Sequence, residues 1–232
     1  MRAPRCRAWW PTPRAPRPTR RVRGSPDPAA GRMRVGVFGG TFDPPHVGHL
    51  LVASDACEAL ALDRMVLVPA GTQPLKAGAI SAPADARLAM TRLLADGDPR
   101  FEVDPIEIDR GGLSFMVDTL GALTGRWNGA ELFLLVGADV LASFDRWRDP
   151  ERVRRLATLV VLTRAADPTA AEAAHATDVD HALIGGPPQR LRTRRVDVSS
   201  TEIRSRVRAG LSIRGFVPES VADFIESAGL YR

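Results

Sequence analysis

The sequence predicts an α/β fold built on a doubly wound parallel sheet. Short apolar, β-branched segments alternate along the chain with amphipathic segments, which is the pattern of a parallel sheet covered on both faces. The chain has 232 residues, of which 44% are hydrophobic, so it can bury a substantial core. A glycine turn separates the first expected strand from the first expected helix. Folds of this class bind ligands beyond the carboxyl ends of the strands, where the strand order reverses.

The expected elements alternate from residue 34 to residue 227. Apolar, β-branched runs predict strands at 34–38, 64–68, 101–108, 131–136, 158–163 and 192–196. Helical periodicity predicts helices at 46–60, 83–96, 114–123, 150–156, 201–209 and 218–227. An Ala/Asp-rich stretch at 165–180 is expected to be a poorly ordered surface excursion or a frayed helix.

Positive charge is concentrated at the start of the chain. The net charge is +5, but residues 1–32 contain nine arginines and one aspartate and so carry +8, which leaves −3 for the remaining 200 residues. Seven prolines and almost no aliphatic side chains predict disorder in this tail. We expect the folded domain to span residues 33–232, with Met33 as the native first residue, because a strand begins directly after it. A nucleic-acid-binding arm is the alternative reading of the tail, but the mildly acidic domain does not indicate a nucleic-acid partner.

Cysteine usage and hydropathy indicate a cytoplasmic protein. Cys6 and Cys57 are too few for a disulfide framework or a cysteine zinc site. The tail lacks the apolar region of a secretory signal peptide, and no apolar run reaches membrane-spanning length. We therefore expect a soluble chain with no membrane partner, and the sequence leaves open whether it forms a homo-oligomer.

The most informative stretch is the glycine–histidine segment, residues 39–49 (GGTFDPPHVGH). Gly39 and Gly40 permit a close approach that a side chain would block. A strand, a turn and a helix start together present backbone N–H groups that can bind phosphate. His46 and His49, two of only four histidines, lie three residues apart on one helical face and add donors. The segment matches neither a P-loop nor a dehydrogenase fingerprint, and we predict a polyphosphate site rather than an ordinary surface turn.

The serine–arginine segment, residues 198–204 (VSSTEIR), is the second candidate. Ser199 and a glutamate three residues later have the spacing of a capping box, which predicts a helix start. That start offers free N–H groups at Ser200 and Thr201, and Arg204 follows one turn later, so the segment can bind an anion. Taken alone, it would be better explained as a well-capped surface helix.

Both segments resemble signatures of the nucleotidylyltransferase superfamily. The first is similar to its Gly-x-Phe-Asp-Pro-x-His-x-Gly-His pattern and the second to its Ile-Ser-Ser-Thr-x-Ile-Arg pattern, in the expected order and about 150 residues apart. The resemblance implies a Rossmann-like nucleotidylyltransferase fold in which the two segments hold ATP phosphates from opposite sides. The residues implied to bind ATP are Gly39, Gly40, Thr41, Phe42, His46, His49, Gly137, Asp139, Ser199, Ser200, Thr201 and Arg204. For Asp139, which follows the strand at 131–136, capping of the next helix is an equal alternative.

Lys76 is the only lysine of the chain, and it follows the second expected strand at the same edge of the sheet. The superfamily often has a basic residue at the end of this loop, near the substrate phosphates. The resemblance therefore implies a catalytic role for Lys76 together with His46, His49 and Arg204. A solvated surface lysine is the alternative reading.

Two further segments resemble bacterial nicotinate-nucleotide adenylyltransferases. Residues 114–120 (SFMVDTL) are similar to the family's Ser-Tyr-Thr-x-Asp-Thr-Leu segment, and residues 135–141, followed by Trp147, are similar to its Gly-x-Asp-x-Leu…Trp segment. Near the end of the chain, residues 216–221 resemble the family's Tyr-x-Pro-x-x-Val. The resemblance covers residues 33–232.

This family binds nicotinate mononucleotide as the acceptor of the adenylyl group. The residues implied to bind it here are Lys76, Ser114, Phe115, Met116 and Trp147. Phe115 and Met116 replace the family's Tyr and Thr, so backbone contacts would be retained and side-chain hydroxyls would not. The indole of Trp147 suits stacking on a flat pyridine ring, with packing beside Phe144 as the alternative.

The implied reaction joins ATP and nicotinate mononucleotide to give nicotinate adenine dinucleotide and pyrophosphate, a step of NAD biosynthesis. Because the attacking group is already an anionic phosphate, catalysis needs positioning and charge neutralisation rather than a strong general base. Mg²⁺ is expected to arrive with the ATP phosphates, and no protein metal site is predicted.

Three alternatives remain open at this point. Phosphopantetheine adenylyltransferase shares the fold and chemistry, but it usually has threonine at the position of His46. A cytidylyltransferase would have both histidines and lack the serine–arginine segment. A non-catalytic nucleotide or nucleic-acid binder is supported only by the arginine-rich tail.

Overall fold

The computed structural model describes residues 31–72, 81–141, 143–164 and 186–232 of the chain. Three expectations fall outside these ranges: the disorder predicted for residues 1–30, the site role of Lys76, and the surface excursion at 165–180.

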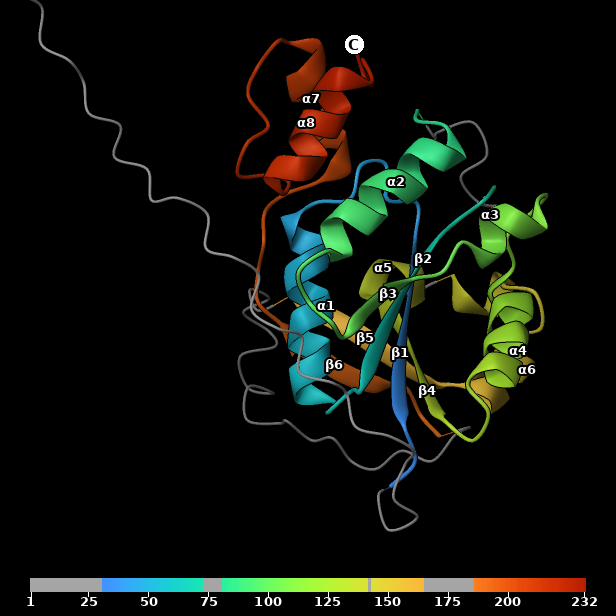
Figure 1. Ribbon diagram of the computed structural model, residues 1–232. Coiled ribbons are helices and arrows are strands. Elements are labelled where there is room, and N and C mark those ends of the chain that lie inside the picture. Colours follow the sequence, from blue (N-terminus) through green and yellow to red (C-terminus); the bar gives the residue numbers. More distant parts are fainter. Residues whose placement is uncertain (1–30, 73–80, 142, 165–185) are drawn as a thin grey trace, which may run out of the picture. The chain divides into compact units, whose positions relative to one another are not determined.

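A parallel sheet of six strands forms the centre of the described chain (Figure 1). In chain order these strands are β1 (Arg34–Gly40), β2 (Arg64–Pro69), β3 (Phe101–Val103), β4 (Glu131–Gly137), β5 (Thr158–Arg164) and β6 (Gln189–Thr193). Their spatial order, β3-β2-β1-β4-β5-β6, reverses direction between β1 and β4. The predicted doubly wound sheet is therefore confirmed, and its switch point lies at the carboxyl ends of β1 and β4.

Helices cover both faces of the sheet. They are α1 (Val47–Ala59), α2 (Ala84–Ala95), α3 (Ile106–Arg110), α4 (Met116–Arg126), α5 (Ala138–Leu141), α6 (Pro150–Leu156), α7 (Ser200–Arg208) and α8 (Glu219–Ser227), with a 3₁₀ turn η1 (Phe144–Arg146). Helices α1 and α2 lie on one side of the sheet, and α4 and α6 lie on the other (Figure 1). Within the described residues, no helix has the length and apolar character needed to cross a membrane.

Strand β4 shows how one sequence supplies both faces. Its side chains alternate, so Leu132, Leu134 and Val136 pack in the cluster that contains α4 and α6, whereas Phe133 and Leu135 pack in the cluster that contains α1 and α2. Burial on both sides explains why the strand reads as a continuous apolar run.

A third apolar cluster joins the end of the chain to α2. Met90 of α2 packs with Ile203 of α7, Val221 and Ile225 of α8, and Tyr231 near the C-terminus. Because α2 starts beside the glycine–histidine segment, this packing brings α7 and the C-terminus to the switch point of the sheet.

One expected strand is shorter than predicted. The apolar run at 101–108 forms a strand only over Phe101–Val103, and α3 begins at Ile106. The Asp104 carboxylate accepts a hydrogen bond from the Ile106 N–H (3.0 Å), and Pro105 fixes a helix-compatible φ of −78°. An Asp-Pro pair is a turn signal, and here it overrides the apolar pattern.

The last strand is displaced from its expected position. A strand was expected at 192–196, but β6 spans Gln189–Thr193, with Leu191 and Thr193 buried and Arg190 and Arg192 exposed. The strand ends there because the backbone N–H of Arg194 donates to the Asp55 carboxylate of α1 (3.1 Å) instead of extending the ladder.

Candidate functional site

The glycine–histidine segment leaves the carboxyl end of β1 and turns into α1. A side chain at Gly39 would lie 2.7 Å from the methyl carbon of Met116, and one at Gly40 would lie 3.0 Å from the Phe42 ring. The Phe42 backbone has a φ of +51°, which is unfavourable for a bulky residue, but its ring is buried against Phe38 and His49. A side chain at Gly39 would require the flexible end of Met116 to move, and one at Gly40 would crowd the Phe42 ring, so both positions are closely packed.

The two histidine rings lie against each other at the start of α1. Their centroids are 3.8 Å apart and the ring planes differ by 38°. The backbone N–H of His46 donates to Nδ1 of His49 (3.2 Å), so the proton of the neutral His49 ring is on Nε2. Burial and, to a smaller extent, the neighbouring His46 hold the pKa of His49 well below its usual value of 6.5. His49 is therefore a neutral ring whose Nε2–H can donate to an anion.

Asp43, within the same segment, is 3% exposed and accepts hydrogen bonds on both carboxylate oxygens. Oδ2 accepts from the backbone N–H of Ser81 (2.7 Å), and Oδ1 accepts from the N–H of Ala82 (3.0 Å) and from the hydroxyl of Tyr231 (2.8 Å). This carboxylate joins the segment to the residues before α2 and to the end of the chain.

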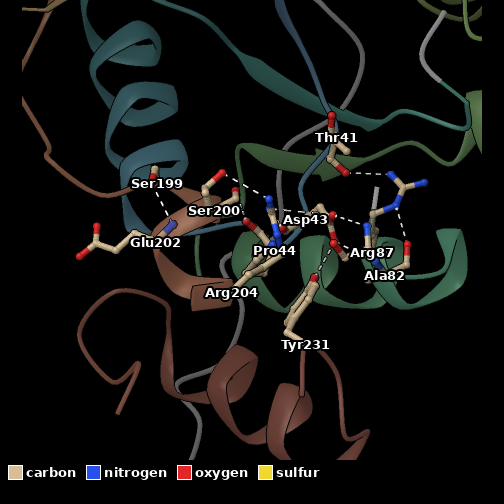
Figure 2. Close-up of polar contacts among 12 residues, drawn as sticks. Thr41, Asp43, Pro44, Ala82, Arg87, Ser199, Ser200, Glu202, Arg204 and Tyr231 are labelled. Atoms are coloured by element: carbon tan, nitrogen blue, oxygen red, sulfur yellow. Dashed lines mark hydrogen bonds and ion pairs between the residues drawn. The ribbon is translucent and has the colours of Figure 1, made fainter. Parts of the chain in front are cut away.

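The serine–arginine segment contacts the glycine–histidine segment directly (Figure 2). The Ser200 hydroxyl donates to the carbonyl of Pro44 (2.8 Å), and Nη1 of Arg204 donates to the carbonyl of Asp43 (2.7 Å). The same guanidinium nitrogen lies 4.0 Å from the Asp43 carboxylate. Two segments separated by about 150 residues therefore form one structure.

The start of α7 has the predicted cap. The Ser199 hydroxyl accepts from the backbone N–H of Glu202 (3.1 Å), which fixes the first turn of the helix. Thr201 is exposed, and its hydroxyl accepts from Nη2 of Arg204 (3.3 Å). Arg204 has five N–H donors and uses two of them in these contacts with Asp43 and Thr201, so its guanidinium can also bind an anion.

Arg87 of α2 is a structural residue of this site that the sequence did not reveal. Its side chain is 1% exposed, and its guanidinium donates to the carbonyls of Thr41 (2.7 Å), Gly71 (3.1 Å) and Ala82 (3.3 Å). Burial lowers its pKa, and the nearby Asp43 partly offsets this effect. Arg87 ties together the loops that follow β1 and β2, and nothing in the residue pattern around it distinguishes it from a surface arginine.

A second buried carboxyl group, Glu107 of α3, lies beside the residues expected to bind the acceptor. It is 3% exposed, its Oε1 accepts from the Thr119 hydroxyl (2.7 Å), and it also accepts from the Ser114 hydroxyl. Burial raises the pKa of Glu107 above its usual value, although these hydrogen bonds oppose the shift. The Ser114 hydroxyl in turn accepts from the backbone N–H of Gly71 (3.0 Å). Ser114, expected to bind the acceptor, thus has its hydroxyl engaged inside the protein.

The remaining expected acceptor residues lie along α4 and η1. Phe115 is the N-cap residue of α4, and the guanidinium carbon of Arg148 lies over its ring, 4.9 Å from the ring centroid. Met116 packs on Gly39, so the two sides of the site meet at this contact. Trp147 is half-buried and packs on Phe144 with centroids 5.2 Å apart, which matches the packing alternative and leaves part of the indole accessible.

Three expected residues remain, and the structure describes them to different extents. Gly137 ends β4, beside β1 at the switch point. Asp139 lies in the short helix α5 directly after that strand, and only its backbone is described. Lys76 lies outside the described residues.

Comparisons with known proteins agree on the family. A sequence model of the cytidylyltransferase-like family matches residues 37–206. A relative from Gemmatimonas aurantiaca, named "probable nicotinate-nucleotide adenylyltransferase", is 56% identical over 200 residues, which cover 86% of this chain and 93% of the relative. A relative of the same name from Roseiflexus is 46% identical and covers 85% of this chain and 98% of its own.

Solved structures agree on the fold. The nicotinic acid mononucleotide adenylyltransferase of Plasmodium falciparum, solved in complex with NaAD, superposes with a TM-score of 0.66 at 14% identity, covering 86% of this chain and 98% of its own. At this identity the match shows a shared fold alone, whereas the curated relatives are similar in sequence over nearly their whole length. The chain therefore belongs to the nicotinate-nucleotide adenylyltransferase family of cytidylyltransferase-like proteins.

Proposed function

We propose that the protein transfers the adenylyl group of ATP to nicotinate mononucleotide, giving nicotinate adenine dinucleotide and pyrophosphate. The observation that carries this proposal is the pair of hydrogen bonds from Ser200 and Arg204 to the carbonyls of Pro44 and Asp43. They join, at the switch point of the sheet, the two segments that we expect to bind phosphate, and this fold class binds nucleotides at that point. The names of the relatives support the choice of acceptor.

In this proposal the triphosphate of ATP lies between the two segments. His46, and His49 through Nε2–H, would donate to it from the start of α1. From the other side, the start of α7 would contribute free N–H groups and Arg204 would contribute positive charge. The residues proposed to line the ATP site are Gly39, Gly40, Thr41, Phe42, Gly137, Asp139, Ser199, Ser200 and Thr201.

The chemistry needs no general base from the protein. The phosphate of the acceptor is already anionic and attacks the α-phosphorus of ATP, forming a new P–O bond as the bond to pyrophosphate breaks. The neutral His49 ring and Arg204 would stabilise the charge that develops on the phosphate oxygens. The acceptor would lie against Trp147, Phe115 and Met116, with Lys76 near the phosphates.

Mg²⁺ fits this site as an ion bound to the ATP phosphates. Among the described residues, no group of three or more histidine, cysteine or acidic side chains could hold a metal. Asp43, the acidic side chain of the segment, already accepts three hydrogen bonds. Phosphate oxygens are ligands that Mg²⁺ prefers, and the ion would neutralise part of their charge. Both substrates are charged nucleotides of the cytoplasm, where we propose that the enzyme acts.

The test is pyrophosphate release from ATP with three acceptors in parallel: nicotinate mononucleotide, nicotinamide mononucleotide and phosphopantetheine. The proposal predicts the highest kcat/KM with nicotinate mononucleotide and no turnover with phosphopantetheine. Turnover with phosphopantetheine alone, or ATP binding without turnover on any acceptor, would overturn it.

A further inference from the structure

Tyr231, the only tyrosine of the chain, connects the C-terminus to the candidate ATP site. It is 8% exposed and packs in the cluster formed by α2, α7 and α8. Its hydroxyl donates to Oδ1 of Asp43 (2.8 Å), 188 positions earlier in the chain. Figure 2 shows the phenol ring pointing from the end of the chain toward this carboxylate.

The contact with Asp43 reaches the residues that would bind ATP. Asp43 also accepts hydrogen bonds from the N–H groups of Ser81 and Ala82, which lie just before α2. Its carbonyl accepts the hydrogen bond from Arg204, and the carboxylate lies 4.0 Å from the same guanidinium nitrogen. The position of the Asp43 side chain therefore affects both the backbone before His46 and the orientation of Arg204.

Through the Tyr231 hydroxyl, the end of the chain helps to hold the Asp43 carboxylate in place. The backbone N–H groups of Ser81 and Ala82 donate to Oδ2 and Oδ1 respectively, and the Tyr231 hydroxyl adds a second donor on Oδ1. Burial and the nearby Asp43 raise the pKa of Tyr231 well above its usual value. The phenol therefore remains a hydrogen-bond donor throughout the neutral pH range.

We propose that Tyr231 is a positioning residue for adenylyl transfer, which acts through Asp43 to align Arg204 with the histidines of the glycine–histidine segment. The inference rests on the proposed function, because alignment matters only if both segments contact the same triphosphate. If Tyr231 had a purely structural role, replacing it would lower the stability of the protein without changing kcat/KM for ATP in the folded enzyme.

The first experiment compares Tyr231→Phe with Arg232→Ala. The phenylalanine retains the ring and its packing and removes only the hydroxyl. The exposed Arg232 side chain donates to the carbonyl of Glu226, so Arg232→Ala is a matched control that removes one side-chain hydrogen bond at the same chain end and leaves the Asp43 contacts in place. A lost hydrogen bond to a charged acceptor predicts a fall of about tenfold in kcat/KM for ATP for Tyr231→Phe. The KM for nicotinate mononucleotide should stay within about twofold, and Arg232→Ala should match the parent chain.

The second experiment uses the single tyrosine as a probe that does not depend on turnover. Incorporation of 3-fluorotyrosine gives one fluorine resonance, from Tyr231. The inference predicts that a non-hydrolysable ATP analogue shifts this resonance and that nicotinate mononucleotide alone leaves it unchanged.

These readouts separate the inference from the proposed function. If the parent chain releases no pyrophosphate with any acceptor, the proposed function fails, while a fluorine shift with the ATP analogue would still show that ATP binding changes the environment of Tyr231. If Tyr231→Phe lowers only the melting temperature and leaves kcat/KM for ATP unchanged, the inference is overturned. An unshifted fluorine resonance in a chain saturated with the analogue also overturns it.

Discussion

Two buried carboxyl groups support the two sides of the candidate site, and they do so with different chemistry. Asp43, on the side proposed to bind ATP, accepts a hydrogen bond on each carboxylate oxygen from a backbone N–H group, which can only donate, and it is also contacted by the Tyr231 hydroxyl and by Arg204. Glu107, on the acceptor side, is contacted by the hydroxyls of Thr119 and Ser114. A hydroxyl can donate or accept, so it adapts to a protonated or an amide partner.

The difference indicates which side depends on a fixed charge. Each carboxylate oxygen of Asp43 faces a backbone N–H group, so an amide NH₂ group at either position would meet a donor. Burial raises the pKa of Glu107, so its neutral form is comparatively stable in the folded protein. The ATP side should therefore tolerate no loss of the carboxylate, whereas the acceptor side needs mainly the shape that Glu107 provides.

The largest expected effect comes from replacing each carboxylate by its amide. Asp43→Asn would direct an NH₂ group at the backbone N–H of either Ser81 or Ala82, and we expect kcat/KM to fall by ~10²-fold, the equivalent of about 2.7 kcal/mol. Glu107→Gln should stay within about fivefold because Thr119 and Ser114 can reorient their hydroxyls. Steady-state pyrophosphate release, on variants with checked melting curves, measures both. Equal losses for the two variants would remove the distinction.

Two glycine substitutions test whether the acceptor side depends on shape. A side chain at Gly71 would lie 2.8 Å from the backbone carbonyl of Glu107, so Gly71→Ala should destabilise the protein by about 1–3 kcal/mol and raise the KM for the acceptor. Gly125 of α4 is exposed, with open space around it, so Gly125→Ala should stabilise the protein by about 0.5–1 kcal/mol. Urea denaturation gives both values. A neutral result for Gly71→Ala would contradict the close contact with Glu107.

The pH dependence of stability should separate the acceptor-side carboxyl group from the ATP-side histidine. The pKa of Glu107 is raised in the folded state, so its contribution to stability falls as pH rises above its unfolded value of about 4.5. The pKa of His49 is lowered, so its contribution is complete above its unfolded value of 6.5 and is lost as pH falls below it.

Removing Glu107 and removing His49 should change the slope of unfolding free energy against pH in opposite directions. Between pH 4.5 and 6.5, stability should rise more steeply with pH in Glu107→Gln than in the parent chain, and less steeply in His49→Gln. One proton limits each effect to about 1.4 kcal/mol per pH unit. Unfolding free energies measured across this range provide the check, and slopes that change in the same direction would contradict the assignment.

The fold was largely predictable because its signals are local. Apolar runs and a glycine turn indicate β1, α1 and the switch point without knowledge of tertiary contacts. The expected strand at 101–108 was wrong beyond Val103 because the Asp104 side chain and Pro105 start a helix there. The expected strand at 192–196 was displaced because its end depends on Asp55, 139 positions away in the chain.

The candidate site was predictable only in part, because many of its contacts join residues that are distant in sequence. The resemblance marked the histidines, Ser200 and Arg204, and the structure brings these segments into contact. It gave no indication of Arg87, Glu107 or Tyr231, because a buried charged or phenolic side chain is recognised only by the partners that surround it. These residues are buried and hydrogen-bond to the backbone and side chains around them. The spacing of residues in the sequence does not predict such contacts.

The proposed function requires that the glycine–histidine and serine–arginine segments bind one triphosphate together. A double-mutant cycle can measure this coupling, with the affinity of a non-hydrolysable ATP analogue determined by calorimetry for the parent chain, His49→Ala, Arg204→Ala and the double variant. Groups that contact one ligand should be coupled, so we expect an interaction energy of at least about 0.5 kcal/mol. Losses that add to within about 0.3 kcal/mol would show that the two groups act independently, and would contradict a shared triphosphate site.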